Sequence, residues 1–466
     1  MLRINKIEPQ IFASVLYTIA TFIGQGMTFL GIIVFSRIMS QEDYGNYSSY
    51  YAYVAIFVAF AGANLYCSIG NAYIDYKDNY YEFKKTVLCL SFLIASIMTI
   101  ASVLICSLFF FAVPYWIVIF AAIHAYSFFV INYGIQAANM ERDYRFKAVL
   151  LVLPFFLQFV FALFAVLIFP NASLYARIIG STFGTGLVAI LIFYKTMIFS
   201  GRLIRIDYWI YALKISLPSI ISSVSYMIMQ QCDKVMITKY CGAEKTAVYS
   251  VIFYMSYAVI ALNSAISPVR MAWIYRKLDT GNISDTKVLQ KWYLILMLIL
   301  ATFLMMLGEL IIMMLAPKEY WEFGYIVPFI LSACAMIMYG FYMEILEFYK
   351  MNIQSSCCVL FCACVNVFLN ALMIPRYGAV AACYTTVFAY ILLFVLTMII
   401  SNSVKSGVYS FSYFVYFMLW MIIMSIVYFV THEYYVMRYI CFVFIILMIG
   451  VFIYLKRAEW GMIIRK

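Results

Sequence analysis

The stretch VLCLSFLIASIMTIASVLICSLFFFA, residues 87–112, runs for twenty-six residues without a charged side chain. A helix crosses a bilayer core of about 30 Å with roughly 20 apolar residues, so this stretch predicts a membrane span. The rest of the chain is similar, because 67% of its 466 residues are hydrophobic and only 11% are charged. A mean hydropathy of +0.98 leaves no soluble half. A soluble enzyme, a secreted disulfide scaffold and a nucleic-acid-binding protein are therefore excluded.

Similar apolar runs recur along the chain and predict an all-α integral membrane protein with about fourteen transmembrane helices. The connections are short, and none is large enough to form a domain outside the membrane. The runs do not alternate between apolar and polar residues, as barrel strands would. The predicted spans cover residues 11–35, 47–70, 87–112, 115–138, 148–169, 175–198, 211–238, 247–272, 289–315, 323–349, 357–374, 379–400, 412–430 and 436–455.

Lysine and arginine gather on one side of these spans. With the N-terminus in the cytoplasm, 23 of the 31 basic residues fall in cytoplasmic loops or at cytoplasmic helix ends. Cytoplasmic loops of membrane proteins carry an excess of these residues, so the bias predicts an even number of spans and two cytoplasmic termini. The net charge of +11 is thus a topology signal before it is a sign of a polyanionic partner.

Weak internal repeats indicate two related halves. The sequences LIFP (167–170) and LMIP (372–375) end two predicted helices 205 residues apart. Polar stripes at helical spacing recur on the first and seventh predicted helices, as Ser14, Thr18, Thr21, Gln25, Thr28 and as Ser219, Ser223, Tyr226, Gln230, Asp233. We expect six-helix bundles in residues 1–200 and 201–402, with two further helices and a basic cytoplasmic tail in residues 403–466.

Three stretches resemble the bacterial polysaccharide flippases that carry O-antigen or capsule repeat units, a family of the multidrug/oligosaccharidyl-lipid/polysaccharide exporter superfamily. SRIMSQEDYGNY (36–47) looks like the family's first outer loop, and NVFLNALMIPRYGAVAA (366–382) is similar to its Asn-x3-Asn, Ile-Pro-x-x-Gly and Gly-Ala-Ala pattern. Val380 stands where the family often has Gly. The remaining stretch is Leu217-Pro218, then QCDKVMI (231–237) and VYS (248–250). The resemblance spans the first twelve predicted helices.

This resemblance implies two six-helix bundles around a central cavity. It also implies transport of undecaprenyl-pyrophosphate-linked oligosaccharides to the outer leaflet of the bacterial cytoplasmic membrane by alternating access. The expected partners are this lipid-linked substrate, the bilayer, and a polysaccharide polymerase with its chain-length machinery. No cofactor and no nucleic acid is expected.

The polar stripe on the seventh predicted helix is the sharpest candidate site. Its residues share one helical face, which lipid would not favour. Asp233 is costly inside a membrane and by default marks a transport pathway. The stripe either lines a substrate cavity or bonds neighbouring helices. The same two interpretations apply to polar residues elsewhere, and the cavity candidates are Gln25, Thr28, Asn132, Gln136, Tyr226, Gln230 and Asp233.

A pyrophosphate headgroup needs cations, because Arg and Lys form charge-assisted hydrogen bonds with phosphate oxygens. The alternative is that these charges only set topology or lie at the membrane interface. Arg37 and Arg270 rank highest, the first in the loop of residues 36–47 and the second after Pro268 near the predicted cytoplasmic side. The full set is Arg37, Arg177, Lys234, Lys239 and Arg270.

Carboxylates are the candidates for coupling transport to an ion gradient. Glu344 and Glu347 lie one turn apart, and two carboxylates in low dielectric would share a proton readily. Both instead fit a structural role as partners of Lys350, one turn further along. His124 is either a proton relay or a core histidine. The ion-coupling candidates are Asp233, Glu309, Glu344 and Glu347, of which Glu309 looks isolated.

No catalytic motif is visible, so we expect a transporter and not an enzyme. The Cys cluster at 357–364 lacks zinc-site spacing, so no metal site is expected. Gly24-Gln25-Gly26 lies inside a predicted span and cannot be a nucleotide-binding loop. A cation-coupled antiporter of small molecules, of the multidrug type, fits the same scaffold and stays an alternative. A membrane polymerase or acyltransferase is disfavoured by the short outer loops.

Overall fold

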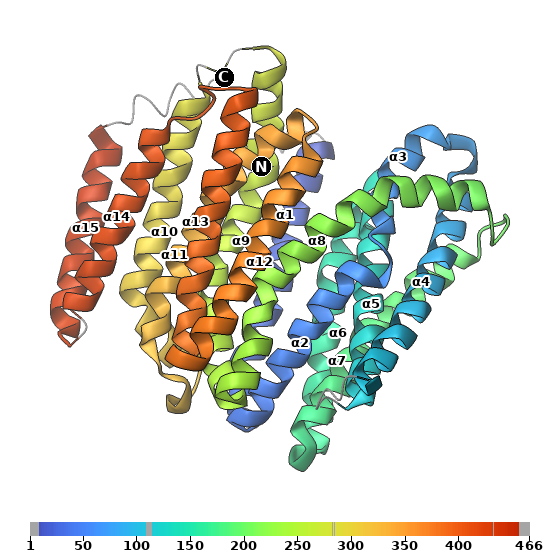
Figure 1. Cartoon of the computed structure of the whole chain (residues 1–466), viewed down its shortest axis with the longest axis horizontal. Coiled ribbons are helices and arrows are strands. Elements are labelled where there is room, and N and C mark those ends of the chain that lie inside the picture. The colour runs from blue at the N-terminus through green and yellow to red at the C-terminus, as the bar shows by residue number, and fades with distance from the viewer. Residues whose placement is uncertain (1–8, 109–113, 282, 284, 432, 456–466) are drawn as a thin grey trace, which may run out of the picture. The chain divides into compact units, whose positions relative to one another are not determined.

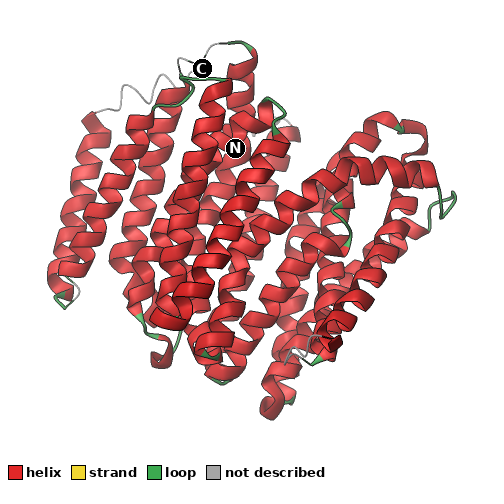
Figure 2. Ribbon diagram, viewed as in Figure 1, coloured by secondary structure: helices red, strands yellow, loops and turns green. Residues whose placement is uncertain are grey.

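The computed structural model describes residues 9–108, 114–281, 283, 285–431 and 433–455, and every regular element within them is helical (Figure 2). Five short 3₁₀ turns join longer helices. The α-helices, labelled in Figure 1, are α1 (Pro9–Ile38), α2 (Gln41–Ala61), α3 (Ser68–Asp75), α4 (Tyr80–Leu108), α5 (Tyr115–Met140), α6 (Tyr144–Ile168), α7 (Ser173–Met197), α8 (Ile206–Cys241), α9 (Ala243–Asp279), α10 (Thr286–Leu315), α11 (Ile326–Phe348), α12 (Asn352–Tyr377), α13 (Ala379–Val404), α14 (Phe411–Val430) and α15 (Tyr435–Leu455).

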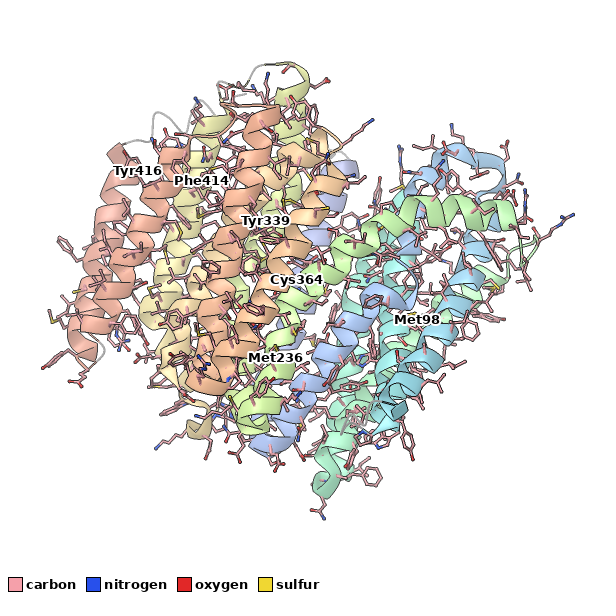
Figure 3. All side chains as sticks on the ribbon, in the orientation of Figure 1. Met98, Met236, Tyr339, Cys364, Phe414 and Tyr416 are labelled. Atoms are coloured by element: carbon pink, nitrogen blue, oxygen red, sulfur yellow. The ribbon has the colours of Figure 1, made fainter. Side chains whose placement is uncertain are left out.

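The helical membrane fold predicted from the sequence is confirmed. Twelve of the described helices are long and apolar enough to cross a membrane, and a bent pair raises the number to thirteen. The fourteenth predicted span coincides with α15, part of which falls outside the residues whose side chains are described. On α14, Phe414 is fully buried while Tyr416 is 66% exposed (Figure 3). Such helices bury one face among themselves and turn apolar side chains toward lipid on the other.

The second predicted span, residues 47–70, differs from expectation because it is broken. α2 ends at Ala61, and the helical segment that follows bends away by 51°. Ala63 and Asn64 adopt left-handed backbone conformations, with φ of 49° and 52°, which interrupt a helix. The Asn64 amide then donates to the Ser223 hydroxyl at 2.7 Å and to the Ser219 carbonyl at 3.3 Å, both on α8.

The chain divides into two compact units. Unit 1 comprises Met1–Ser250 and Val359–Ala379, and unit 2 comprises Val251–Cys358 and Val380–Lys466. Unit 1 therefore holds α1 to α8, the beginning of α9 and the second part of α12. Unit 2 holds α10, α11 and α13 to α15 with the remainder of α9 and α12. The division at residues 200 and 402 rests on the internal repeat and stays a prediction.

Within unit 1, α6 and α7 approach closely at two glycines of α7. A Cβ on Gly180 would lie 2.5 Å from the carbonyl oxygen of Phe161, and a Cβ on Gly184 would lie 2.5 Å from that of Leu157. Small residues four positions apart let membrane helices bring their backbones together, because lipid tails provide no hydrophobic drive for association. The sequence Gly180-Ser181-Thr182-Phe183-Gly184 has this spacing.

Replacing Gly184 with Val is expected to push α6 and α7 apart and to lower the free energy of unfolding by about 1–3 kcal/mol. The measurement is thermal unfolding of the purified protein in detergent. Gly186→Val on the same helix is the matched control, because the nearest atom to a Cβ there is the Ser127 hydroxyl at 3.9 Å. Equal losses in the two variants would contradict the close approach at Gly184.

Candidate functional site

Asp233 of α8 is buried in unit 1 and accepts hydrogen bonds from two other helices. The Tyr249 hydroxyl of α9 donates to Oδ2 at 2.6 Å, and the Asn370 amide of α12 donates to Oδ1 at 2.7 Å. Only 3% of Asp233 is exposed. A carboxylate removed from water needs such donors, since an unsatisfied buried charge is costly. Asp233 thus joins α8, α9 and α12 in one polar cluster.

The neighbouring Lys234 continues this polar contact toward α2. Its side chain is 2% exposed and donates to the Gln231 side-chain oxygen at 3.0 Å. Its backbone carbonyl accepts from the Ser49 hydroxyl of α2 at 3.4 Å and from Thr238 at 3.0 Å. Lys234, predicted as a phosphate-binding residue, therefore lies inside the packing of α2 against α8.

Part of the polar stripe on α8 bonds a neighbouring helix, and for the rest the cavity interpretation stays a prediction. Ser219 and Ser223 contact Asn64, so they belong to helix packing. Tyr226 and Gln230 are half-buried, and the Gln230 amide donates to the Tyr226 hydroxyl at 3.1 Å. Partly exposed hydroxyl and amide groups retain the capacity to meet a polar ligand. The remaining cavity candidates of unit 1, Gln25 and Thr28 of α1 and Asn132 and Gln136 of α5, are also half-buried.

Arg177 of α7 is enclosed by aromatic rings. Its guanidinium carbon lies 3.7 Å from the ring centre of Tyr47, 4.1 Å from that of Phe35 and 4.9 Å from that of Tyr44. Only 8% of the residue is exposed. The negative faces of aromatic rings attract a cation at these distances. Arg177 therefore holds α7 against α1 and α2.

The other basic candidates of unit 1 are more exposed than Arg177 and Lys234. Arg37 is exposed at the end of α1, where its guanidinium donates to the Ile33 carbonyl at 2.6 Å. Lys239 is exposed near the end of α8. Such cations have the accessibility that a phosphate ligand requires, whereas Arg177 and Lys234 are committed to packing.

His124 lies fully buried on α5, 3.2 Å from the Tyr50 hydroxyl through Nδ1. Tyr50 is also 3.1 Å from the Thr182 hydroxyl, whose own proton goes to the Ile178 carbonyl at 2.8 Å. Thr182 must then accept from Tyr50, which leaves the Tyr50 oxygen to accept a proton from Nδ1. The bonding thus assigns the Nδ1–H tautomer, and no donor among the described residues meets Nε2. His124 thus has a hydrogen-bond partner on another helix, because Tyr50 belongs to α2.

Arg270 and Glu344 form a buried ion pair in unit 2. Arg270 Nη2 and Nε donate to Glu344 Oε1 at 2.7 Å and 3.1 Å. The rings of Tyr293 and Phe341 flank the guanidinium, at 4.3 Å and 4.0 Å from their centres. Arg270 is 4% exposed and Glu344 6%. The pair joins α9 to α11, and both of its charges are buried.

The predicted partner of Glu344 was wrong. Lys350 lies past the end of α11 with φ of 58°, so the spacing of a continuous helix no longer aligns it with Glu344. Glu347 is exposed and accepts from the Tyr275 hydroxyl at 3.4 Å. Two carboxylates one turn apart in sequence therefore have different environments.

Glu309 is also paired, contrary to its isolated position in the sequence. Arg438 of α15 binds both of its oxygens, at 2.7 Å and 2.9 Å, and the Tyr428 hydroxyl of α14 donates at 2.7 Å. Arg438 is 0% exposed and Glu309 1%. The two partners lie 129 positions apart in the chain, which no local sequence pattern reveals.

The fold resembles those of known membrane transport proteins. Lipid II flippase MurJ in an inward closed conformation matches with a TM-score of 0.70 and 16% identity, over 95% of this chain and 99% of that one. An inward-facing multidrug resistance MATE transporter of the MOP superfamily matches with 0.61 and 13%, over 84% and 95%. A MOP superfamily transporter from Pyrococcus furiosus matches with 0.57 and 14%, over 86% and 97%. The chain therefore shares the fold of these three transport proteins.

The family follows from the sequence. Residues 13–274 match the family of polysaccharide biosynthesis proteins, and the chain belongs to it. No curated protein shows a significant match. The predicted family resemblance is confirmed, while the roles of individual residues stay predictions.

Replacing Glu309 with Gln is expected to lower the free energy of unfolding by about 3–5 kcal/mol, because Arg438 would keep a buried charge without a carboxylate. Thermal unfolding in detergent measures the loss. Glu309→Gln combined with Arg438→Gln removes both charges and should recover much of the stability. If Glu309→Gln unfolds like the parent protein yet stops transport, Glu309 serves ion coupling and not the attachment of α15.

Proposed function

We propose that the protein moves undecaprenyl-pyrophosphate-linked oligosaccharide units from the inner to the outer leaflet of the bacterial cytoplasmic membrane by alternating access. The polysaccharide assembled from these units would be O-antigen, capsule or a related polymer. Membership of the polysaccharide biosynthesis family carries this proposal. The fold shared with a lipid II flippase along 95% of the chain supports it. The distribution of basic residues supports cytoplasmic termini.

The substrate class explains why such a protein is needed. Sugar hydroxyls and a pyrophosphate lose their water on entering hydrocarbon, at a cost of several kcal/mol for each unpaired group. A transporter lowers this cost with polar side chains that are shielded from lipid and remain partly accessible. Gln25, Tyr226 and Gln230 are half-buried and fit this role. Arg37 and Lys239 are exposed cations suited to the pyrophosphate.

Residues that already bond to other helices would have roles other than contact with the substrate. Asp233 is bound by Tyr249 and Asn370, so we assign it to positioning α8 and, when it exchanges a proton, to coupling. Glu344 and Glu309 are each bound by an arginine. Among the described residues, the contact of Glu347 is the long hydrogen bond from the Tyr275 hydroxyl at 3.4 Å. Asp233 and Glu347 are therefore the carboxylates to test first for ion coupling.

The antiporter alternative rests on one observation, the similarity of the fold to multidrug resistance transporters. It differs from the flippase in substrate, and it predicts a different phenotype when the gene is lost.

Deleting the gene is expected to leave lipid-linked repeat units on the cytoplasmic face and to remove the surface polysaccharide. Extraction of lipid-linked intermediates, with and without complementation by the intact gene, measures this. Loss of drug resistance with an unchanged surface glycan would contradict the flippase and identify the antiporter.

Gln25→Ala, Gln230→Ala and Asp233→Ala are each expected to abolish export, because each removes a polar group from the transport path or from the helix that lines it. Surface polysaccharide is the readout, and immunoblotting of membranes separates transport defects from loss of protein. Gln354→Ala, at an exposed position of α12, is the matched control. Normal surface polysaccharide in all three variants would rule out this path.

A further inference from the structure

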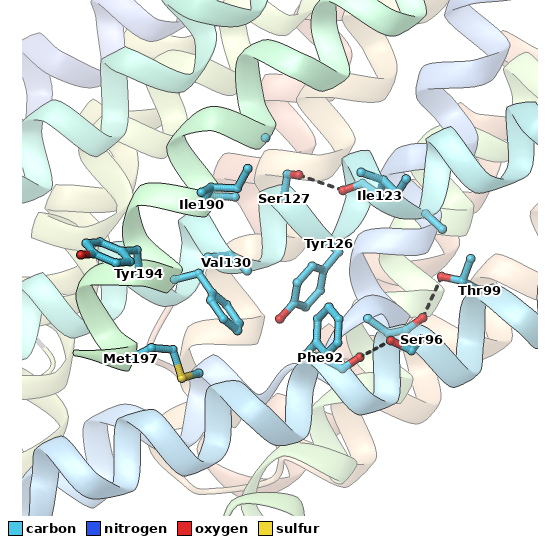
Figure 4. A pocket seen from close by; sticks show the side chains of 15 residues that line it. Phe92, Ser96, Thr99, Ile123, Tyr126, Ser127, Val130, Ile190, Tyr194 and Met197 are labelled. Atoms are coloured by element: carbon cyan, nitrogen blue, oxygen red, sulfur yellow. Dashed lines mark hydrogen bonds between the residues drawn. The ribbon is translucent and has the colours of Figure 1, made fainter. Parts of the chain in front are cut away.

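An apolar groove of about 610 Å³ lies between α4, α5 and α7 in unit 1 (Figure 4). The hydroxyl protons of Ser96, Thr99 and Ser127 on its wall are used within the helices, because each of these residues donates to a carbonyl of its own helix at 2.7–2.8 Å. The Tyr126 hydroxyl lies 3.2 Å from that of Ser91. No charged residue lines the groove. Its surface therefore suits a hydrocarbon chain and offers little to a sugar or a cation.

The groove is open along its length to the surroundings of the helices. Phe92 of α4 is 51% exposed, and Ile190 and Tyr194 of α7 are 65% and 67% exposed. Large apolar side chains exposed on a membrane helix face lipid. The groove is therefore accessible to a lipid from the bilayer, without passage through the protein.

A lysine stands at one end of the groove. Lys85 precedes Phe92 by seven residues on α4, and Thr99 follows Phe92 by seven, so the three share one helical face. Lys85 Nζ donates to the carbonyls of Phe199 and Gly201 at 2.9 Å and 3.4 Å. These two residues belong to the segment 198–205 between α7 and α8. Met197, the last residue of α7, lines the groove, so the segment bound by Lys85 begins at this end of the groove.

The charges around this end leave a positive excess. Arg205 contacts both carboxylates of the neighbourhood, Glu82 at 3.6 Å and Asp207 at 2.5 Å. The Lys85 ammonium and the guanidinium of the exposed Arg202 form no salt bridge among the described residues, although the Arg202 backbone N–H donates to Glu82 Oε1 at 3.0 Å. Next to Arg202, Leu203 and Ile204 are 51% and 58% exposed. Basic and apolar side chains side by side are typical of the level of lipid headgroups.

We propose that the groove holds one acyl chain of an anionic phospholipid whose phosphate binds Lys85 and Arg202. Seven helical residues rise about 10 Å, so the groove from Phe92 to Thr99 accepts part of an acyl chain, and a further 10 Å separates Phe92 from Lys85. In a phospholipid the charged phosphate lies close to the acyl chains, so a chain in the groove would place its phosphate near Lys85. A polyisoprenoid carrier is much longer than the groove. Under the predicted topology the site faces the cytoplasmic leaflet.

This site goes beyond the proposed transport and does not depend on it. A lipid that binds only the folded protein stabilises it in proportion to its concentration. Here the phosphate would connect α4 to the segment that leads from α7 into α8. An anionic headgroup favours such basic sites between membrane helices on the cytoplasmic side.

Native mass spectrometry of the delipidated full-length protein tests the proposal, with palmitoyl-oleoyl phosphatidylglycerol and phosphatidylcholine as probes that differ only in headgroup. We expect phosphatidylglycerol to bind more tightly, and Lys85→Gln with Arg202→Gln to weaken it about tenfold. Lys77→Gln with Arg145→Gln, two exposed basic residues elsewhere, is the charge-matched control and should leave binding unchanged. Equal binding of the two lipids, or equal losses in the two double variants, would overturn the headgroup assignment.

Filling the groove tests the position of the chain. Gly186→Phe is expected to abolish lipid binding, because a Cβ there meets only the Ser127 hydroxyl and its ring would enter the groove. Ser96→Phe fills the groove from α4 if the first variant fails to fold. Ile179→Phe, at a 49% exposed position of α7, is the control. Unchanged binding in folded groove-filling variants, or displacement of phosphatidylglycerol by equimolar undecaprenyl phosphate, would overturn the proposal.

Discussion

Hydrocarbon offers no hydrogen bonds, so a chain that crosses a membrane must satisfy its polar groups with one another. In the helices, backbone groups bond to one another within each helix. Polar side chains are satisfied by a small number of buried pairings, of which Glu309 with Arg438 and Tyr428 is the most enclosed. That pairing attaches α14 and α15 to α10, and the Arg270–Glu344 pair does the same for α9 and α11. Without partners these charges would oppose the fold that they now hold together.

Packing in unit 1 follows the same constraint with smaller groups. The backbone of α7 approaches that of α6 at Gly180 and Gly184, since close contact replaces the missing hydrophobic drive between helices. Hydroxyls in the groove of α4, α5 and α7 bond to their own helices and leave an apolar surface. Small residues therefore serve as contacts between helices in one place and as part of the groove wall in another.

The division of polar residues between packing and other roles also bears on the proposed transport path. A polar residue in a membrane helix marks either packing or a pathway, and bonds to other helices identify residues that serve packing. Asn64 uses Ser219 and Ser223 for packing, whereas Tyr226 and Gln230 on the same face stay half-buried. The sequence placed all four on one stripe because helical periodicity is local. It could not separate them, because the neighbouring helix arrives from elsewhere in the chain.

The sequence by itself determined the helical class, the position of most spans and the polysaccharide biosynthesis family. Apolar length and short motifs are local properties, and hydrocarbon thickness sets the length of each span. Only the tertiary structure decided that Arg438 neutralises Glu309, that Glu344 binds Arg270 and not Lys350, and that α2 breaks after Ala61. These depend on residues brought together from distant helices, and contact between them is a property of packing that one-dimensional spacing does not contain.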